Sequence, residues 1–167
     1  MRVISVVGWK NNGKTTLVVR LVEHLTRQGL AVSTIKHAHH SIDLDRPGKD
    51  SWRHREAGAK EVVLATSRRW ILMHELREAA EPSLPELLAK LADVDLVIVE
   101  GFKGTSLPKI EVHRAERGTE LIARTDPDVV AVAADVDLAD LAVPVIHLDD
   151  IAALADVVLE HAREIDR

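Results

Sequence analysis

The stretch VVGWKNNGKTTL, residues 6–17, begins inside the apolar run VISVV near the start of the chain. It places Gly8 and Gly13 in the spacing G-x-x-x-x-G-K-[ST], with Lys14 and Thr15 in the last two positions. This spacing is typical of a phosphate-binding loop when a strand precedes it and a helix follows it. The flanking residues favour both elements, so the stretch predicts a nucleoside triphosphate loop. A glycine-rich turn that only caps the helix is the alternative.

Each part of the loop is suited to one task in phosphate binding. The glycines let backbone amides turn toward phosphate oxygens, and the following helix adds positive potential. Lys14 is expected to neutralise the terminal phosphates, and Thr15 to offer its hydroxyl to Mg²⁺. Asn11 and Asn12 tolerate unusual backbone angles, and their amides could also reach a phosphate. The predicted nucleotide-binding residues in this loop are Gly8, Trp9, Lys10, Asn11, Asn12, Gly13, Lys14, Thr15 and Thr16.

Strand-like and helix-like segments alternate along the chain. Runs typical of strands that are buried on both faces of a parallel sheet begin at residues 3, 31, 96 and 129. Helices are predicted over residues 15–28, from Ser83 with its capping partner Glu86, and from residue 150 to about residue 163. This alternation predicts an α/β fold with a doubly wound, mostly parallel sheet of the P-loop NTPase type.

One segment departs from the alternation. Residues 61–76, EVVLATSRRWILMHEL, consist of two apolar runs around a polar turn at residues 67–69, which predicts an inserted β-hairpin. The hairpin could extend the sheet as an edge meander. It could instead form an arm that pairs with a second subunit, because exposed strand edges invite pairing. Residues 1–167 are expected to form a single nucleotide-binding domain around it.

Composition narrows the possible partners. Only 2% of the residues are aromatic, which gives little support for stacking on nucleic-acid bases. The 22 basic and 27 acidic side chains give a net charge of −5, unlike the basic footprint of a nucleic-acid-binding protein. Cysteine is absent, so disulfides and thiolate metal sites are excluded. Without a long apolar run or a signal-peptide pattern, the chain is expected to be cytoplasmic, with neither nucleic acid nor membrane as a partner.

An acidic residue is placed where it could serve the phosphate loop. In the stretch DLVIVEGFKG, Glu100 ends an apolar run that predicts a buried strand. Parallel sheets bind ligands at the carboxyl ends of their strands. A carboxylate there can hold Mg²⁺ or its waters, because this ion prefers one or two carboxylates together with phosphate oxygens. A strand-end acid that only faces solvent is the alternative.

Histidines and cations gather in residues 35–59, IKHAHHSIDLDRPGKDSWRHREAGA. A zinc site would need further ligands in a closed geometry, and no cysteine is available to complete it. A loop that contacts phosphates, Mg²⁺ or a second anionic ligand is the favoured interpretation, and a solvated polar loop is the alternative. The predicted contact residues are His37, His39, His40, Lys49 and Arg53.

Taken together, these stretches resemble the MobB family of molybdopterin-guanine dinucleotide biosynthesis adaptor proteins. The resemblance rests on GWKNNGKTTL at Gly8, the histidine-rich stretch at Ile35, VIVEGFKG at Val97 and LPKIEVHR at Leu107. It implies a small GTP-binding protein, a homodimer with at most weak GTPase activity. Such a protein assists the molybdopterin guanylyltransferase that attaches GMP to molybdopterin. The implied partners are therefore this enzyme and molybdopterin itself.

The same resemblance assigns tasks to individual residues. Residues 8–16 would hold the phosphates of GTP, while Thr15 and Glu100, joined by Asp50, would serve Mg²⁺. Guanine must be recognised without the usual N-K-x-D motif, because Asn11 and Asn12 are the chain's two asparagines. Asp135, at the end of VVAVAAD, could accept hydrogen bonds from the N1 and N2 groups of guanine, or it could simply cap the strand end.

Two other functions remain open at this point. One is a small-molecule kinase or ATP-dependent ligase of the same fold, with residues 36–45, KHAHHSIDLD, forming a second substrate pocket. The other is an interaction module in which the nucleotide only stabilises the dimer. Fast turnover without a partner would favour the first of these alternatives.

Overall fold

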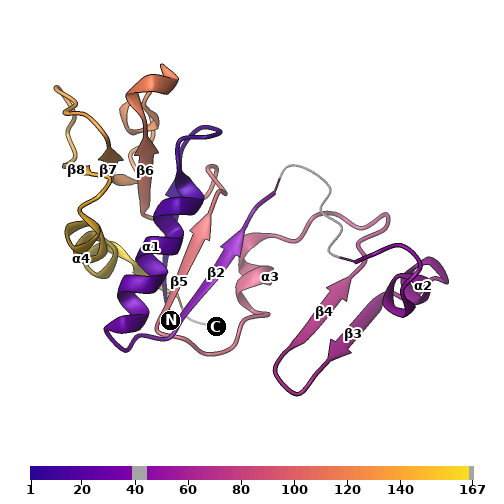
Figure 1. The fold of residues 1–167 in the computed structure, drawn as a ribbon. Coiled ribbons are helices and arrows are strands. Elements are labelled where there is room, and N and C mark those ends of the chain that lie inside the picture. Colours follow the sequence, from indigo (N-terminus) through magenta and orange to yellow (C-terminus); the bar gives the residue numbers. More distant parts are fainter. Residues whose placement is uncertain (39–44, 166–167) are drawn as a thin grey trace. The chain divides into compact units, whose positions relative to one another are not determined.

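A computed structural model describes residues 1–38 and 45–165 of the chain (Figure 1). The chain divides into two compact units. Met1–His37 and Leu87–Arg167 form the first unit, and Ala38–Glu86 forms the second. Within the described part, no helix has the length and apolar character needed to cross a membrane.

The first unit is built on a sheet in which seven strands are described. Its order is β2-β5-β1-β6-β7-β8 with all neighbours parallel, and β9 pairs antiparallel with β1. This arrangement confirms the predicted mostly parallel α/β fold. The strands are β1 (Arg2–Val7), β2 (Val32–Lys36), β5 (Leu96–Glu100), β6 (Lys109–His113), β7 (Val129–Ala134), β8 (Val145–His147) and β9 (Arg163–Glu164).

Two helices, α1 (Lys14–Arg27) and α4 (Ile151–His161), pack on one face of this sheet (Figure 1). Their apolar sides meet the strands in one core cluster, as the predicted helical periodicity requires. Helix α1 ends at Arg27, and Gly29 follows with a φ of 92°, which lets the N–H of Leu30 donate to the carbonyl of Leu25 at 3.2 Å. Asp150 caps α4 by accepting from the N–H of Ala153 at 3.1 Å.

The helix predicted from Ser83 is short. It is helix α3 (Leu84–Leu88), which has five residues. Glu86 accepts from the N–H of Ser83 at 2.8 Å and from its hydroxyl at 2.6 Å, so this capping pair is present.

Strand β6 was not predicted, because its sequence KIEVH alternates polar and apolar residues although the whole strand is buried. Its polar side chains are paired with the segment that follows. Lys109 binds Asp126 at 2.7 Å, and Glu111 accepts from the N–H groups of Ile122 and Ala123 at 2.9 and 2.8 Å. The segment after β6 also contains the short 3₁₀ helices η1 (Ala115–Arg117) and η2 (Ile122–Arg124).

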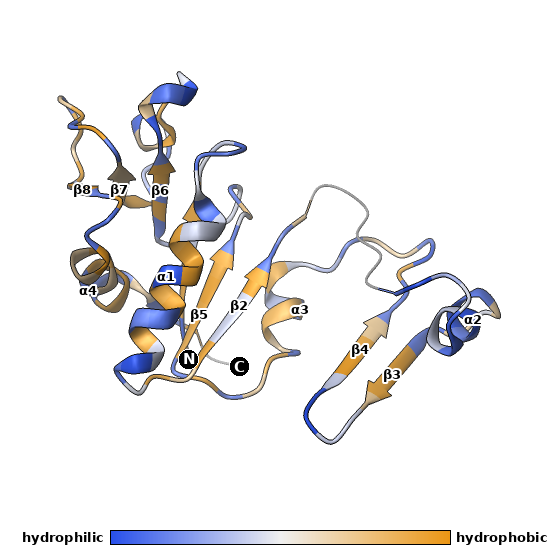
Figure 2. Ribbon diagram, in the orientation of Figure 1, coloured by the Kyte–Doolittle hydropathy of each residue, from blue (hydrophilic) through white to orange (hydrophobic). Residues whose placement is uncertain are grey.

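The second unit contains the predicted hairpin, formed by β3 (Glu61–Ala65) and β4 (Trp70–His74), and the helix α2 (Asp50–Glu56). The two strands form a separate antiparallel sheet, so the edge-meander interpretation is wrong. Both strands are largely hydrophobic (Figure 2). Arg55 of α2 binds Glu75 at 2.8 Å and Asp45 at 3.3 Å, which ties the helix to the residue that follows β4.

Candidate functional site

The phosphate loop joins β1 to α1 at the carboxyl edge of the sheet. A Cβ added at Gly8 would lie only 2.5 Å from the carbonyl oxygen of Val112, so no larger residue fits there. Gly13 stands immediately before α1 with a φ of 96°, and Asn11 has a φ of 65°. These left-handed angles favour glycine and are tolerated by asparagine. The glycine spacing of the sequence is therefore a geometric requirement of the loop.

Lys14 lies across this loop. Its Nζ donates to the carbonyl oxygens of Gly8 and Trp9, both at 2.9 Å. Burial lowers the pKa of the Lys14 ammonium, the nearby cations Lys103 and Lys36 lower it further, and Glu100 acts in the opposite direction. Cations gathered in this way repel one another, so a bound anion would relieve the repulsion. The electrostatics of the loop therefore suit a phosphate ligand.

The predicted metal-binding pair is brought together at the start of α1. The hydroxyl of Thr15 donates to Glu100 Oε1 at 2.8 Å. Lys36 Nζ lies 3.1 Å from Thr15 Oγ1 and 3.1 Å from the same Glu100 oxygen. An ammonium cation therefore already sits against two oxygen ligands, and a hydroxyl and a carboxylate are ligands that Mg²⁺ accepts beside phosphate oxygens and water. These residues fit the magnesium ion that the P-loop pattern implies.

Because Lys36 and Mg²⁺ would use the same oxygens, we expect them to compete. Lys36→Met should lower the melting temperature of the metal-free protein by about 2–4 °C, roughly 1 kcal/mol for a half-exposed ion pair. Millimolar Mg²⁺ should then stabilise this variant more than it stabilises the wild type, as measured by thermal denaturation with and without the ion. Glu100→Gln is the control with the opposite expectation: it removes a predicted ligand of the ion, so Mg²⁺ should no longer raise the melting temperature. An unchanged response in Lys36→Met would show that the two cations do not compete.

Two other loop residues are held by protein contacts. Asn12 is fully buried, and its Nδ2 donates to Thr119 Oγ1 at 3.2 Å. The indole N–H of Trp9 donates to the carbonyl of Glu120 at 2.8 Å, and Lys103 Nζ lies 3.8 Å from the centre of its ring. Both side chains thus fasten the loop to the segment that follows β6. Trp9 also provides a face for a cation.

Asp135 lies at the end of β7, and both of its oxygens have protein partners. Oδ1 accepts from the N–H of Ala115 at 2.9 Å, and Oδ2 lies 3.5 Å from Arg114 Nη1. Arg114 in turn approaches the phosphate loop, because its Nε is 3.3 Å from the position that a Cβ at Gly13 would occupy. Arg114 therefore connects Asp135 with the loop.

The predicted histidine-rich loop is divided between the two units. His37 lies in the first unit, where its N–H donates to the carbonyl of Glu100 at 2.9 Å and its ring is 4.6 Å from that of Phe102. His39 and His40 lie outside the described residues.

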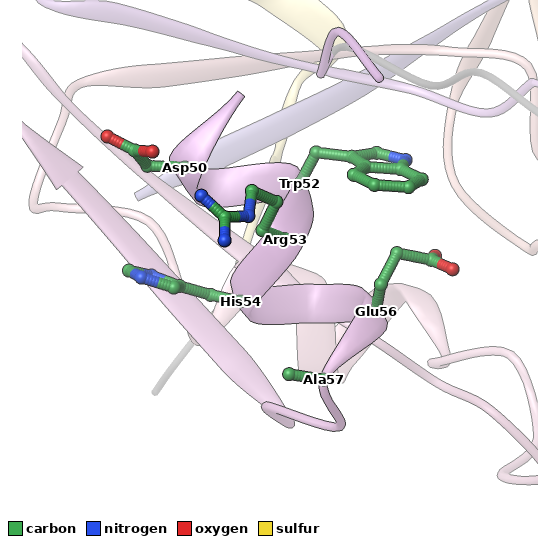
Figure 3. A pocket seen from close by; sticks show the side chains of 6 residues that line it. All are labelled: Asp50, Trp52, Arg53, His54, Glu56 and Ala57. Carbon is green, nitrogen blue, oxygen red and sulfur yellow. The ribbon is translucent and has the colours of Figure 1, made fainter. Parts of the chain in front are cut away.

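The remaining predicted residues of this loop belong to the second unit. Asp50 and Arg53 line a cavity of about 510 Å³ on α2, together with Trp52, His54, Glu56 and Ala57 (Figure 3). Lys49 directly precedes α2. Across residues 1–38 and 45–165, no three His, Asp or Glu side chains come together as a group that could hold a metal.

Three cations near the loop were missed by sequence reasoning: Lys36, Lys103 and Arg114. Each of them lies inside a stretch that the sequence analysis quoted, namely the histidine-rich stretch from Ile35, VIVEGFKG and LPKIEVHR, but none was singled out there. Their positions in these stretches were the available signal.

The family model described as "Molybdopterin guanine dinucleotide synthesis protein B" matches residues 3–135. The chain belongs to the MobB family. Its match spans the phosphate loop, the hairpin unit, Glu100 and the LPKIEVHR stretch of this chain.

Individual MobB proteins agree with this assignment. The molybdopterin-guanine dinucleotide biosynthesis adapter protein of Escherichia coli (strain K12) is 39% identical over 162 residues, which cover 94% of this chain and 91% of that protein. The adapter protein of Haemophilus influenzae is 41% identical over 138 residues, covering 81% of this chain and 75% of that protein.

Solved structures of MobB proteins share the fold. The crystal structure of Bacillus subtilis MobB has a TM-score of 0.76 at 24% identity, covering 99% of this chain and 100% of that one. The structure of a MobB homolog from Bacillus stearothermophilus has a TM-score of 0.71 at 28% identity, covering 96% and 97%.

Proposed function

We propose that this chain is a GTP-binding adaptor in molybdopterin guanine dinucleotide biosynthesis. Its membership of the MobB family supports the pathway. The observation that carries the nucleotide is the meeting of Lys14, Thr15 and Glu100 at one end of the sheet, where cations converge on a glycine loop. Binding and positioning a triphosphate needs such groups. We propose weak GTPase activity at most, with nucleotide binding as the chain's main task.

In this proposal residues 1–167 act as a single nucleotide-binding domain. Lys14 and the loop amides hold the phosphates, Thr15 and Glu100 serve Mg²⁺, and Asp135 belongs to the base end of the site. The sequence also predicts Asp50 as a metal ligand, and it predicts a second anionic ligand, for which molybdopterin is the candidate, at His37, His39, His40, Lys49 and Arg53. These assignments stay predictions. The protein works in the cytoplasm as a homodimer, and its partner is the molybdopterin guanylyltransferase that attaches GMP.

The test is a binding and turnover experiment with purified protein. GTP should bind in calorimetry with an affinity that depends on Mg²⁺, and turnover by the chain alone should be slow. Adding the chain to a molybdopterin guanylyltransferase should raise the yield of molybdopterin guanine dinucleotide. Rapid ATP-dependent turnover without the partner enzyme would replace this proposal with the kinase or ligase function. Nucleotide binding without any effect on the partner enzyme would leave a nucleotide-stabilised interaction module.

A further inference from the structure

A second hollow lies along the same edge of the sheet as the phosphate loop. Its volume is about 220 Å³, and it is lined by Ala134, Asp135, Val136, Asp137, Val145 and His147. Ala134 and His147 end the neighbouring parallel strands β7 and β8, residues 135–137 follow β7, and Val145 begins β8 (Figure 1). Ligands of open α/β sheets bind in crevices outside the carboxyl ends of strands. Pockets for drug-sized ligands measure roughly 300–1,000 Å³, so this smaller hollow suits one flat heterocycle better than a whole nucleotide.

Contacts connect this hollow to the phosphate loop. Asp135, in its wall, lies 3.5 Å from Arg114, and Arg114 reaches to within 3.3 Å of the Cβ position at Gly13. Strand order gives the same connection, because β6 lies between β1 and β7. A ligand with its phosphates on the loop could therefore place its other end in the hollow.

Two side chains that line the hollow can hydrogen-bond to a ligand: Asp137 as an acceptor and His147 as a donor. The carboxylate of Asp137 has no hydrogen-bond or ion-pair partner among the described residues and is exposed. His147 Nδ1 accepts from the N–H of Asp149 at 3.2 Å. A neutral imidazole that accepts at Nδ1 carries its hydrogen on Nε2, so His147 presents a donor.

We infer that this hollow takes the guanine base, with Asp137 accepting from its N1 and N2 groups and His147 Nε2 donating to its O6. This inference rests on the proposed binding of GTP. Guanine has an acceptor at O6 and donor hydrogens at N1 and N2, whereas adenine has a donor amino group in place of O6 and an acceptor at N1. Adenine would therefore set donor against donor and acceptor against acceptor. The oxygens of Asp135 are already engaged by Ala115 and Arg114, so this residue joins the base end to the phosphate end.

A matched pair of substitutions tests the assignment. Asp137→Asn keeps one acceptor oxygen and replaces the other with a donor amide, which suits xanthine, because xanthine has a carbonyl where guanine has its amino group. GTP affinity should fall about tenfold and xanthosine triphosphate affinity should rise. ATP affinity should rise as well, because the new amide can donate to the acceptor at N1 of adenine, which the carboxylate opposes. Asp135→Asn should weaken the binding of all three nucleotides by a similar factor, because Asp135 holds Ala115 and Arg114 rather than the base, and should leave their order of preference as in the wild type. His147→Ala should weaken GTP binding without weakening ATP binding.

The readout is calorimetric titration of the full chain and each variant with GTP, ATP and xanthosine triphosphate, with circular dichroism as the check of folding. A change of base preference in Asp135→Asn rather than Asp137→Asn would overturn the inference. A wild type that binds GTP and ATP equally would also overturn it and would leave the phosphate site intact. A wild type that binds none of the three would overturn the proposed GTP function itself, so the two failures can be told apart.

Discussion

Replacing Lys14 with alanine is expected to lower GTP affinity about a hundredfold, about 2.7 kcal/mol at 25 °C. Hydrogen bonds to charged groups contribute about 1.5–3 kcal/mol each, and this ammonium is placed on the loop to meet the terminal phosphates. In the structure the Lys14 ammonium donates to the carbonyl oxygens of Gly8 and Trp9. The backbone of the loop needs no cation at these two oxygens to remain folded. The lowered pKa of Lys14 shows that burial and the neighbouring cations disfavour its charge. We therefore expect the variant to keep its fold.

Lys10→Ala provides the matched control for this experiment. It removes the same charge from the same loop, but the Lys10 side chain is exposed. An exposed charge pair contributes about 0.2–1 kcal/mol, so this control should weaken GTP binding by no more than about fivefold. Calorimetric titration of both variants with GTP gives the comparison. Equal affinities for GTP in the wild type and Lys14→Ala would rule out the phosphate-loop assignment.

The phosphate loop was predictable because its geometry depends on a few consecutive residues. The spacing of Gly8 and Gly13, followed by Lys14, is sufficient to define it, and the strand and helix beside it have strong local patterns. The ends of the helices are equally local, as Gly29 after α1 and Asp150 before α4 illustrate. Sequence reasoning therefore located the loop and the two residues Thr15 and Glu100 that meet beside it.

Contacts that depend on strand order could not be read in this way. Lys36 meets Glu100 because β2 lies beside β5 in a register that pairs these two residues. Arg114 approaches Gly13 because β6 lies beside β1. Strand β6 itself was missed because an alternating pattern normally indicates one exposed face. Here the polar face is buried, with Lys109 and Glu111 paired to a later segment of the chain.

The hairpin was predicted, but its independence from the main sheet was not, since an apolar hairpin has the same sequence pattern whether it pairs with a sheet edge or stands alone. Its register places Val63 opposite Leu72 and Ala65 opposite Trp70 on one face. The exposed fractions of Val63, Trp70 and Leu72 are 59%, 65% and 41%. An apolar surface of this kind marks an interaction site more often than a free surface. The proposed homodimer would cover it.

Charging this face is therefore expected to separate the two subunits. Val63→Lys would place an ammonium group in an apolar interface, where an unpaired charge costs several kcal/mol. Each 1.4 kcal/mol, roughly, changes a dissociation constant tenfold, so the dissociation constant of the dimer should rise at least a hundredfold. Ser67→Lys is the matched control, because it adds the same charge at the exposed turn of the same hairpin and should leave the dimer intact. Sedimentation equilibrium measures both variants, with circular dichroism confirming that each is folded. A wild-type chain that sediments as a monomer at micromolar concentration would refute the dimer, and a folded Val63→Lys variant that still dimerises would place the interface on another surface.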